Sequence, residues 1–453
     1  MPRLPMIGSD AAQWGALLND FLRVAHREDG APRGQGLALD VRDFGVVGDG
    51  ATDDTAALAA CLQQAGQLGQ TAFLRAGLNV RVTGNLFLYG HASLVGENPD
   101  DCTITLDGDL EASGAGMSAY WFNCGIPSKG GTPATWTGRI TGVQFRITLA
   151  GLGTAPYLHL LQFHKAAHFE LKNCRFDLTP VGHAPVAALV SQLDGNWCAS
   201  PGTTHGRIED NLFLGASHGS PATGGSGGIN LVGLDGGLIA GNVIEGFADD
   251  AIALINCRRC VVRDNWVKGV RSRIAAFSGN DITFLSNRLE RQPGADNAWV
   301  LDTDFYTAHP AGPASAAPEN IKFIGNTAVL PGAAPSGGWH NFLDLGGVRN
   351  CVASGNLFIN DSNQVNPPRL LTWVFTAFPG WTDPTGNDPP GKARPYRVVL
   401  TNNLLTGQYP GRIEEAAVLA ADLVGPIVYQ GNLAGGFNVF GSNSFWEDSN
   451  KLL

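Results

Sequence analysis

The sequence predicts an all-β protein, built as a solenoid in which short parallel strands stack coil upon coil. Three observations lead to this prediction. Charged residues make up only 15% of the 453 residues and glycine occurs 60 times, a composition typical of strands joined by turns. An asparagine followed by apolar residues recurs, most closely at Asn242, Asn265 and Asn287, which are 23 and 22 residues apart. Short apolar runs with glycines lie between these asparagines, whereas a helical repeat would place apolar residues every three or four positions.

The repeated asparagines are expected to mark one corner of each coil. An asparagine can adopt the left-handed backbone conformation there, and its side chain can bond to the next along the stack. One coil cannot bury its apolar face alone, so many coils must stack. The expected role of the repeated asparagines is therefore structural. The repeats are centred on Asn173, Asn211, Asn242, Asn265, Asn287, Asn326, Asn356, Asn403 and Asn432, with Gly142 in the equivalent place of a further unit.

The stretch "DFGVVGDGATDDTAALAACLQQAG" begins at Asp43 and is followed by "TAFLRAGLNVRVTGNLFLYGHASLVGEN". Together they resemble the N-terminal signature of the pectate-lyase-like superfamily of right-handed parallel β-helices, which includes polygalacturonases, mannuronan epimerases and bacteriophage tailspikes. The resemblance covers roughly residues 40–106 and implies one β-helix domain over 37–453 with about ten or more coils. A capping α-helix is expected over residues 54–66. Asp53 or Asp54 provides its N-cap, and Gly66 ends it.

The first 36 residues are expected to form a helical segment and a linker. Ser9 or Asp10 can cap a helix in which Trp14, Leu18 and Phe21 share one face. The segment is similar to the N-termini of phage and prophage tail proteins, although it could instead be a helix packed on the base of the solenoid. The tail resemblance implies a virion-associated or prophage-encoded protein, otherwise a cytoplasmic one. Resemblance to tailspikes implies a homotrimer.

Charge and composition narrow the possible partners. A net charge of −10 and a pI near 5.4 disfavour nucleic acid, which requires a basic face, whereas a neutral or polyhydroxyl partner suits this surface at least as well. No apolar run suits a Sec signal peptide or a membrane span. Cys257 and Cys260 form one C-x-x-C pair without a second, so buried thiols are favoured over zinc. We expect no metal or other cofactor, except calcium if the protein is a lyase.

The first candidate catalytic group is Asp249 and Asp250 in "ADDAIAL". This stretch is similar to the Gly-Asp-Asp-Cys-Ile motif of polygalacturonases, in which the Asp pair serves glycosidic cleavage. It departs from that motif because alanine replaces the glycine and the cysteine. The matching His-Gly and Arg-Ile-Lys are also missing, the nearest stretch being "RSRIAA", which contains Arg271 and Arg273.

Stacking supplies a second argument for this group. It should bring Asp250 against an arginine of the next coil and place it about 10 Å from Asp296, two coils away, near the spacing of inverting glycosidases. Arg271 and Arg273 would bind substrate. The alternative is a structural ladder of ion pairs.

The second candidate group is "WVLDTDFYTAH", which contains Asp302, Asp304, Tyr306 and His309. The two aspartates alternate, so both should project from one face at the solvent edge of a strand, where they could bind calcium or act as acid and base. Tyr306 and His309 would bind substrate or serve a lyase or epimerase. The alternative is an exposed strand end entering a long loop. Asp235 in "GLDG" is expected in the equivalent place two coils earlier.

Long insertions with aromatic and histidine side chains, among them His218 and Trp339, suggest a groove for an extended polysaccharide. The expected function is a tailspike-like depolymerase that hydrolyses glycosidic bonds with paired aspartates. A lyase or C5-epimerase acting on uronate polymers is the first alternative. A glycan-binding or structural tail protein without catalysis is the second.

Overall fold

A computed structural model describes residues 38–452. The gaps in this description are 108–118, 129–130, 133, 149–157, 180–185, 192–202, 216–226, 248–249, 270–272, 292–297, 305–316, 333–339, 362–368, 374, 377–391, 394, 408–411, 416–426, 439–443 and 447–449. The predicted helix of the first 36 residues therefore lies outside the described residues.

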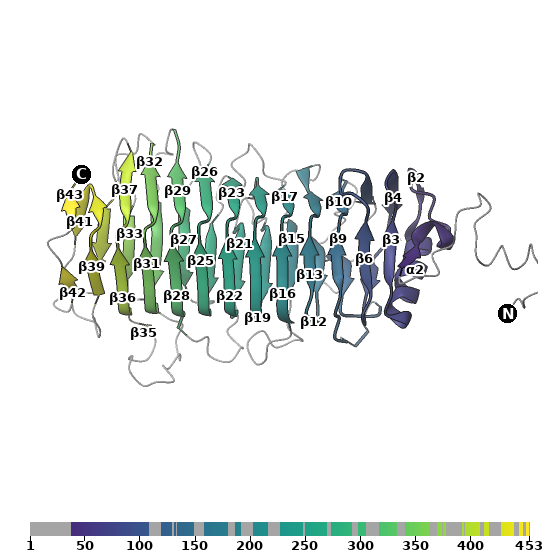
Figure 1. Ribbon diagram of the computed structural model, residues 1–453, viewed down its shortest axis with the longest axis horizontal. Helices are drawn as coiled ribbons and strands as arrows, with labels where there is room; N and C mark the ends of the chain where they lie inside the picture. The colour runs from purple at the N-terminus through teal and green to yellow at the C-terminus, as the bar shows by residue number, and fades with distance from the viewer. Residues whose placement is uncertain are drawn as a thin grey trace, which may run out of the picture.

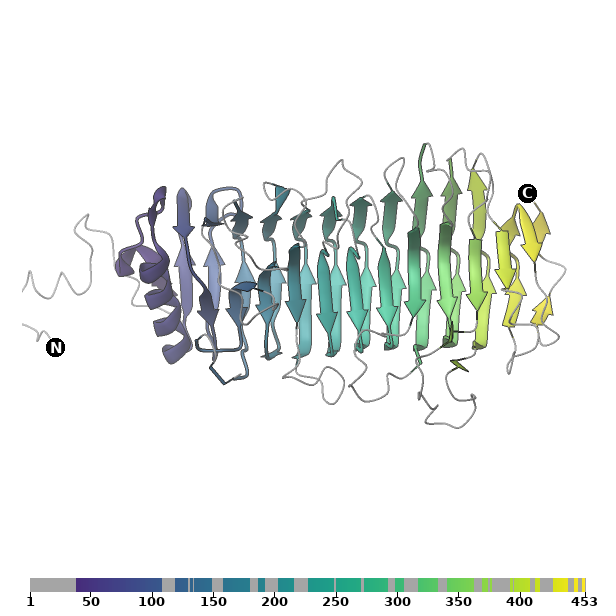
Figure 2. The ribbon, with the colours of Figure 1, turned by 180° about the vertical axis from the view of Figure 1, so that it is seen from behind.

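The chain winds as a right-handed parallel β-helix with three long sheets, and its coils stack in a row from one end of the molecule to the other (Figure 1; Figure 2 from behind). Through the regular coils the chain visits the 15-stranded, the 14-stranded and the 12-stranded sheet in turn, as in the run β19, β20, β21. All strand pairs between coils are parallel, and the one antiparallel pair in the described residues joins β34 (Phe375–Thr376) to β35 (Lys392–Ala393).

The 15-stranded sheet contains β1 (Ala38–Asp40), β3 (Thr71–Leu74), β6 (Ser93–Gly96), β9 (Arg139–Thr141), β12 (Ala166–Ala167), β13 (Glu170–Lys172), β16 (Thr203–Glu209), β19 (Leu234–Ala240), β22 (Arg258–Arg263), β25 (Asn280–Leu285), β28 (Glu319–Ile324), β31 (Arg349–Ser354), β36 (Tyr396–Thr401), β39 (Ile427–Gln430) and β42 (Ser444–Trp446). The 14-stranded sheet contains β2 (Asp49–Asp53), β4 (Leu78–Val82), β7 (Cys102–Leu106), β10 (Gln144–Ile147), β14 (Arg175–Asp177), β17 (Leu212–Leu214), β20 (Val243–Glu245), β23 (Trp266–Gly269), β26 (Arg288–Arg291), β29 (Thr327–Leu330), β32 (Leu357–Asn360), β37 (Leu404–Gly407), β40 (Leu433–Ala434) and β43 (Lys451–Leu452).

The 12-stranded sheet contains β5 (Leu86–Leu88), β8 (Ala119–Cys124), β11 (Leu158–Phe163), β15 (Val186–Ser191), β18 (Ile229–Val232), β21 (Ile252–Ile255), β24 (Ile274–Phe277), β27 (Ala298–Asp304), β30 (His340–Gly346), β33 (Arg369–Trp373), β38 (Arg412–Glu415) and β41 (Gly436–Asn438). The long sequence insertions adjoin strands of this sheet: residues 292–297 lead into β27 and residues 333–339 lead into β30.

The predicted asparagine ladder is present at the corner between the 15- and 14-stranded sheets. Asn242 donates from its side-chain amide to Oδ1 of Asn265 at 2.9 Å, and Asn265 donates to Asn287 at the same distance. Each of these amides also donates to a backbone carbonyl, such as that of Ile239 for Asn265. These bonds satisfy polar groups that are otherwise buried, which is why asparagine recurs there.

Two details of the predicted corner were wrong. The left-handed residue is the one before each ladder asparagine, for example Gly241 with φ +66° before Asn242. In the coil of "KNCRF" the ladder position belongs to Cys174, whose backbone N–H donates to Oδ1 of Asn211. Asn173 is the left-handed residue of that coil. The reason is that the ladder side chain must point into the corner, whereas the left-handed residue turns the chain.

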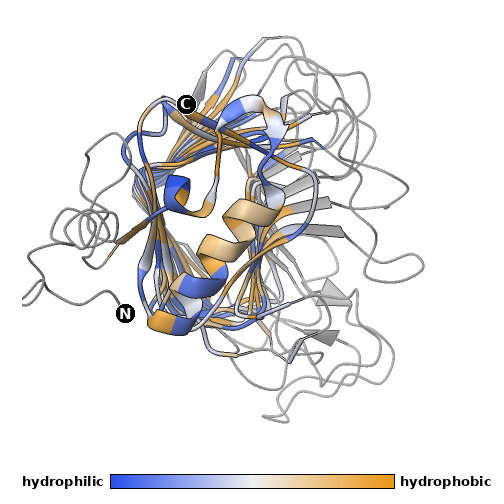
Figure 3. Cartoon of the chain, turned by 90° about the vertical axis from the view of Figure 1, so that its right-hand side faces the viewer, coloured by the Kyte–Doolittle hydropathy of each residue, from blue (hydrophilic) through white to orange (hydrophobic). Residues whose placement is uncertain are grey.

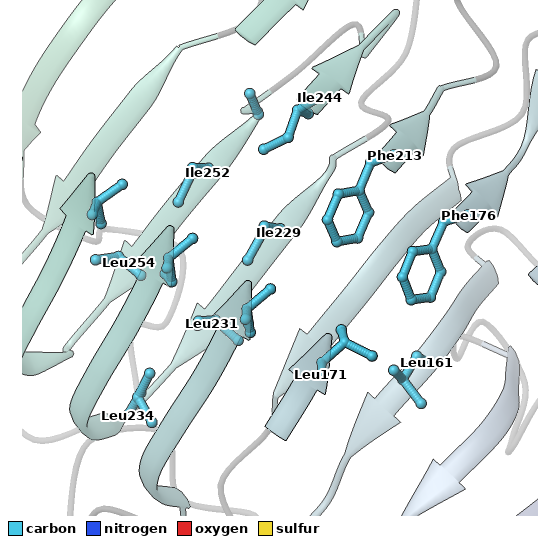
Figure 4. Packing of buried hydrophobic residues seen from close by; sticks show 14 of the residues in the cluster. Leu161, Leu171, Phe176, Phe213, Ile229, Leu231, Leu234, Ile244, Ile252 and Leu254 are labelled. Atoms are coloured by element: carbon cyan, nitrogen blue, oxygen red, sulfur yellow. The ribbon is translucent and has the colours of Figure 1, made fainter. Parts of the chain in front are cut away.

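Large apolar side chains stack inside the coil in register, as Figure 4 shows for Phe176 and Phe213. Their ring centroids lie 4.7 Å apart with an interplanar angle of 5°, and Phe145 stacks on the other side of Phe176 at 5.2 Å. This spacing is that of neighbouring strands, so identical residue types on successive coils build the core.

A helix, α2 (Thr55–Leu68), lies across the N-terminal end of the solenoid (Figure 3). Leu58, Cys61, Leu62 and Ala65 are fully buried and belong to the main core cluster. The helix extends beyond the predicted Gly66 to Leu68, because the left-handed cap is Gly69. Asp54 is the N-cap residue, but its carboxylate accepts from the backbone N–H groups of Val47 and Gly48, and it is the Asp53 carboxylate that accepts from the backbone N–H of Thr55, at 3.0 Å.

Seven of the eight cysteines lie in the described part of the chain, and all seven are free and buried. Among the described helices none is long and apolar enough to cross a membrane.

Candidate functional site

Four neighbouring strands of the 12-stranded sheet, β21, β24, β27 and β30, carry the candidate site. Side chains alternate between the core and the outer face of such a sheet. Leu301 and Leu343 belong to the core, so the following residues, Asp302 and Asp344, face outward. Asp302 pairs in register with Ala275 on one side and with Asp344 on the other. The two carboxylates therefore project from adjacent strands on the same face.

Arg273 connects the acidic groups of the two coils on either side of its own. Its Nε donates to Oδ1 of Asp250, and its Nη1 donates to Oδ2 of Asp302 at 2.7 Å. These groups are largely shielded from water, with side-chain exposures of 18% for Arg273, 12% for Asp250 and 4% for Asp302. A planar guanidinium can bond two carboxylates at once, which makes it suited to this bridging position.

The environment of Asp302 favours its protonated form. The pKa of this carboxyl is raised to about 8: burial is the largest cause, the Arg273 guanidinium lowers the pKa, and the charges of Asp344 and Asp250 raise it. Removal from water disfavours the charged form most where like charges are close. At neutral pH Asp302 therefore holds a proton while facing other carboxylates, which is the condition for a general acid.

Asp344 is held by Asn341 of the same strand, whose side-chain amide donates to Oδ2 at 2.7 Å. Residues three apart normally lie on opposite faces of a strand. The pairing of β30 with β33 shifts in register between Asn341 and Leu343, and both Phe342 and Leu343 are buried in the core. This irregularity turns Asn341 to the face of Asp344. β-bulges often re-aim side chains in this way beside active sites.

The structure brings together three of the residues predicted for the site. The prediction that a carboxylate and a guanidinium of neighbouring coils meet is confirmed for Asp250 and Arg273, and Asp302 joins them. The expected solvent-edge position of Asp302 was wrong, because it is 3% exposed. Asp304 ends β27, and its side chain lies outside the described set. The other predicted site residues lie outside the described residues: Asp249, Arg271, Asp296, Tyr306, His309, His218 and Trp339.

Sequence reasoning misplaced Asp235 and missed Asp344 and Asn341. Asp235 belongs to β19 in the 15-stranded sheet and pairs with Arg258 and Arg259, so it does not share the position of Asp302. "NFLDLG" shows the same alternation of leucine and aspartate as "WVLDTD", and that likeness was the available signal for Asp344.

No group of three or more histidine, cysteine, aspartate or glutamate side chains in the described residues is arranged to hold a metal ion. The prediction of buried thiols at the C-x-x-C pair is confirmed. Cys257 and Cys260 are each 1% exposed, and their thiols donate to backbone carbonyls.

Comparison with known proteins places the chain in a family. The family described as rhamnogalacturonase A/epimerase, pectate lyase-like matches residues 38–302, more than half of the chain. The protein belongs to this family. A stretch of 82 residues is 40% identical to the mannuronan C5-epimerase AlgE3 of Azotobacter vinelandii, and 39% identical to AlgE2 of the same organism. The match spans 18% of this chain but only 4% of AlgE3 and 7% of AlgE2.

Solved structures show the same fold for this pectate-lyase-like chain. The A-module of the mannuronan C-5 epimerase AlgE6 of Azotobacter vinelandii has a TM-score of 0.51 at 14% identity, covering 91% of this chain and 99% of that one. The N-terminal fragment of bacteriophage Phi29 gene product 12 also has a TM-score of 0.51, at 12% identity, covering 92% of this chain and 68% of that one.

Proposed function

We propose that this protein hydrolyses glycosidic bonds of a polysaccharide, with Asp302 as the proton donor. The observation that carries the proposal is the buried Asp302 carboxyl, whose pKa is raised to about 8 by burial beside Asp344 and Asp250. A carboxylic acid that remains protonated at neutral pH can give its proton to the leaving glycosidic oxygen. Arg273 orients that carboxyl through the 2.7 Å bond.

The polysaccharide substrate is supported by two features. The family description includes a rhamnogalacturonase, and the matched curated relatives are mannuronan epimerases. The outer face of an unbroken 12-stranded sheet is also long enough to accommodate an extended chain. The proposed hydrolysis needs no metal ion, because the carboxyl groups supply both the proton and the negative charge.

Epimerisation or β-elimination on a uronate polymer is the second candidate. It is favoured by the 40% identity to AlgE3 over 82 residues. Both reactions remove the proton at C5, which requires a base, and Tyr306 and His309 remain the candidates for that role. A lyase of this kind could also use calcium. Its unsaturated product absorbs ultraviolet light, whereas hydrolysis gives no such absorbance.

A homotrimer attached to a phage or prophage tail is the assembly we propose. It is supported by the tail-like pattern of the first 36 residues and by the resemblance of the N-terminal signature to a superfamily that includes bacteriophage tailspikes. A glycan-binding tail protein without catalysis is the outcome if no polymer is cleaved and proton NMR shows no uronate polymer epimerised at C5.

The test is a panel of purified capsular, lipopolysaccharide and pectic polymers incubated with the full chain. Products are read as new reducing ends, as ultraviolet absorbance and by mass. We expect reducing ends without absorbance on at least one polymer. Absorbance would support the lyase instead, and an unchanged polymer in every case would reject enzymatic cleavage of the panel.

The variant Asp302→Asn should lower the rate on the cleaved polymer by ~100-fold or more, because an amide cannot donate a carboxyl proton. Asp235→Asn is the matched control. Asp235 is also a buried aspartate with arginine partners, but it lies in another sheet. Its variant should keep the parental rate, and equal losses in both variants would indicate damage to the fold.

A further inference from the structure

We infer that the outer face of the 14-stranded sheet carries a second, non-catalytic binding site for a polysaccharide of uronate sugars. The inference does not rest on the proposed hydrolysis. The site lies on a different sheet from Asp302, so it is separate from the candidate catalytic group. It is a row of outward side chains on β14, β17, β20 and β23, called here the outer strip: Arg175, Leu212, Val243 and Trp266.

The side chains of the outer strip form one row because their strands pair in register. Arg175 pairs with Leu212, Leu212 with Val243, and Val243 with Trp266. The next residue of each strand, such as Val267 after Trp266, belongs to the core, so the strip faces outward. Neighbouring strands lie about 4.8 Å apart, so the three intervals of the row span about 14 Å along the solenoid. That length accommodates a short stretch of an extended polymer.

Trp266 provides a flat ring at one end of the outer strip. Among the exposed large hydrophobic residues in the described part of the chain it is the one aromatic, with 38% of its surface exposed. The Lys268 ammonium lies 3.4 Å from the centroid of its ring, a cation–π contact that fixes the orientation of the indole. An indole ring held in this way offers an apolar surface to the C–H groups of a sugar ring.

Arg175 provides a positive charge at the other end. Its Nε is buried and has no hydrogen-bond partner, and buried polar groups are almost always bonded, so this exception requires an explanation. The residue as a whole is half-buried, so a ligand can approach the guanidinium. A guanidinium bonds carboxylates in a fixed geometry. The carboxylate of a bound ligand would supply the missing acceptor.

The other arginines that project from this outer face already have carboxylate partners. The pairs are Arg81–Asp107, Arg146–Asp177 and Arg288–Glu290. Arg175 has no such pair among the residues that the structure describes. Because the protein as a whole carries a net charge of −10, an arginine without an acid is a local exception on this surface. It favours an anionic ligand over a neutral one.

The middle of the outer strip is apolar. Leu212 and Val243 are half-buried there, and Leu214 and Glu245 lie beside them as the next outward pair in register. The leucines and the valine suit the C–H faces of sugar rings, and the Glu245 carboxylate can accept from sugar hydroxyl groups. Each unit of a uronate polymer has an apolar ring face, hydroxyl groups and a carboxylate, which are the three features that the strip can bind.

The test measures binding of the full chain by affinity electrophoresis. Polygalacturonate and polymannuronate are the uronate polymers, dextran is the neutral polymer, and polyphosphate is a polyanion without sugar rings. We expect retardation by at least one uronate polymer and none by dextran. Trp266→Ala should weaken the uronate binding about 10-fold, which corresponds to ~1.4 kcal/mol, and leave any retardation by polyphosphate unchanged. Retardation by neither uronate polymer, or equal retardation by dextran, would overturn the inference.

Charge variants on the same face locate the carboxylate. Arg175→Gln should weaken uronate binding about as much as Trp266→Ala does. Arg81→Gln is the matched control, because it removes the same charge from the same face but outside the outer strip, and it should bind as the parent does. Equal losses in the two glutamine variants, or none in either, would contradict a site at the strip. Trp266→Phe keeps a ring and most of the binding, and it decides if the alanine variant does not fold.

Two further measurements separate the outer strip from other roles of the same residues. Trp266→Ala should leave unchanged the initial rate on short oligosaccharides of any polymer that the parent cleaves, and a lower rate would contradict a non-catalytic site. Light scattering should give this variant the mass of the parent. A lower mass would make the strip a contact between copies of the chain and overturn the glycan site. Binding is measured without cleavage, so failure of the proposed hydrolysis leaves the inference standing.

Discussion

Nη1 of Arg273 lies 2.7 Å from Oδ2 of Asp302, and the same guanidinium donates to Asp250. Replacing Arg273 by glutamine removes the cation that bonds the poorly exposed Asp250 and Asp302, so we expect a loss of roughly 3–5 kcal/mol in the free energy of unfolding at pH 7. Urea denaturation measures this loss.

The exposed pair of Arg288 and Glu290 is the control for this prediction. Arg288→Gln should change the free energy of unfolding by no more than about 1 kcal/mol, since water screens such a pair. Equal effects of the two glutamine variants would contradict the bridging role of Arg273.

The raised pKa of Asp302 predicts a pH dependence of stability. In the unfolded chain this carboxyl loses its proton near its ordinary pKa of about 4, whereas the folded protein keeps it up to about 8. The unfolded state therefore binds fewer protons between these values, and Asp302 lowers stability as pH rises through that window. The Tm difference between Asp302→Asn and the parent should become more positive from pH 4 to pH 8. A difference that does not change with pH would contradict the raised pKa.

Asp235 should show the opposite sign. Burial alone would raise the pKa of Asp235, but Arg258 and Arg259 outweigh it and hold the pKa below its ordinary value. Its ion pairs are present above the ordinary pKa of about 4 and are lost as pH falls. Asp235→Asn should therefore lower Tm more at pH 7 than at pH 3, as measured by thermal melts in the same buffers.

The asparagine ladder predicts a gradient of stability effects. Asn265→Ala removes the bonds to Asn287 and Ile239 and leaves the donors of Asn242 without their acceptor. Each unsatisfied buried group costs about 1–3 kcal/mol, so the total loss should exceed about 3 kcal/mol in a chemical denaturation experiment. Asn450→Ala, at the partly buried end of the ladder, should cost less. A similar loss at both positions would argue against a cooperative ladder.

The role of helix α2 in covering the end of the core is tested by two leucines of the same helix. Leu62 is fully buried, whereas Leu68 is 57% exposed. Leu62→Ala should lower the free energy of unfolding by about 2–5 kcal/mol through the lost packing. Leu68→Ala should stay within about 0.5 kcal/mol. Both values come from denaturant unfolding.

Assembly is tested by light scattering of the full chain. The proposed trimer should show three times the chain mass of 47.6 kDa. A monomer mass would contradict the tail-protein proposal and leave the fold and the site unaffected.

The sequence by itself determined the coil architecture, because every stacked coil requires the same residue types at the same places along its length. The asparagines at 242, 265 and 287 had to recur at one corner, since only a side chain with both a donor and an acceptor can bond to the backbone and to its copy above. The helix before the first coils was predictable for a similar local reason. Its end was misjudged by a few residues, because Gly69 rather than Gly66 adopts the left-handed cap.

Only the tertiary structure decided which carboxylates meet. Asp302 and Asp344 are 42 residues apart, and insertions of unequal length separate the strands, so residue spacing alone could not give their register. Backbone hydrogen bonding between β27 and β30 fixes that register, and the irregular pairing after Asn341 sets the face of its side chain. Burial, which raises the pKa of Asp302, likewise results from the packing of distant segments and has no local signature in the sequence.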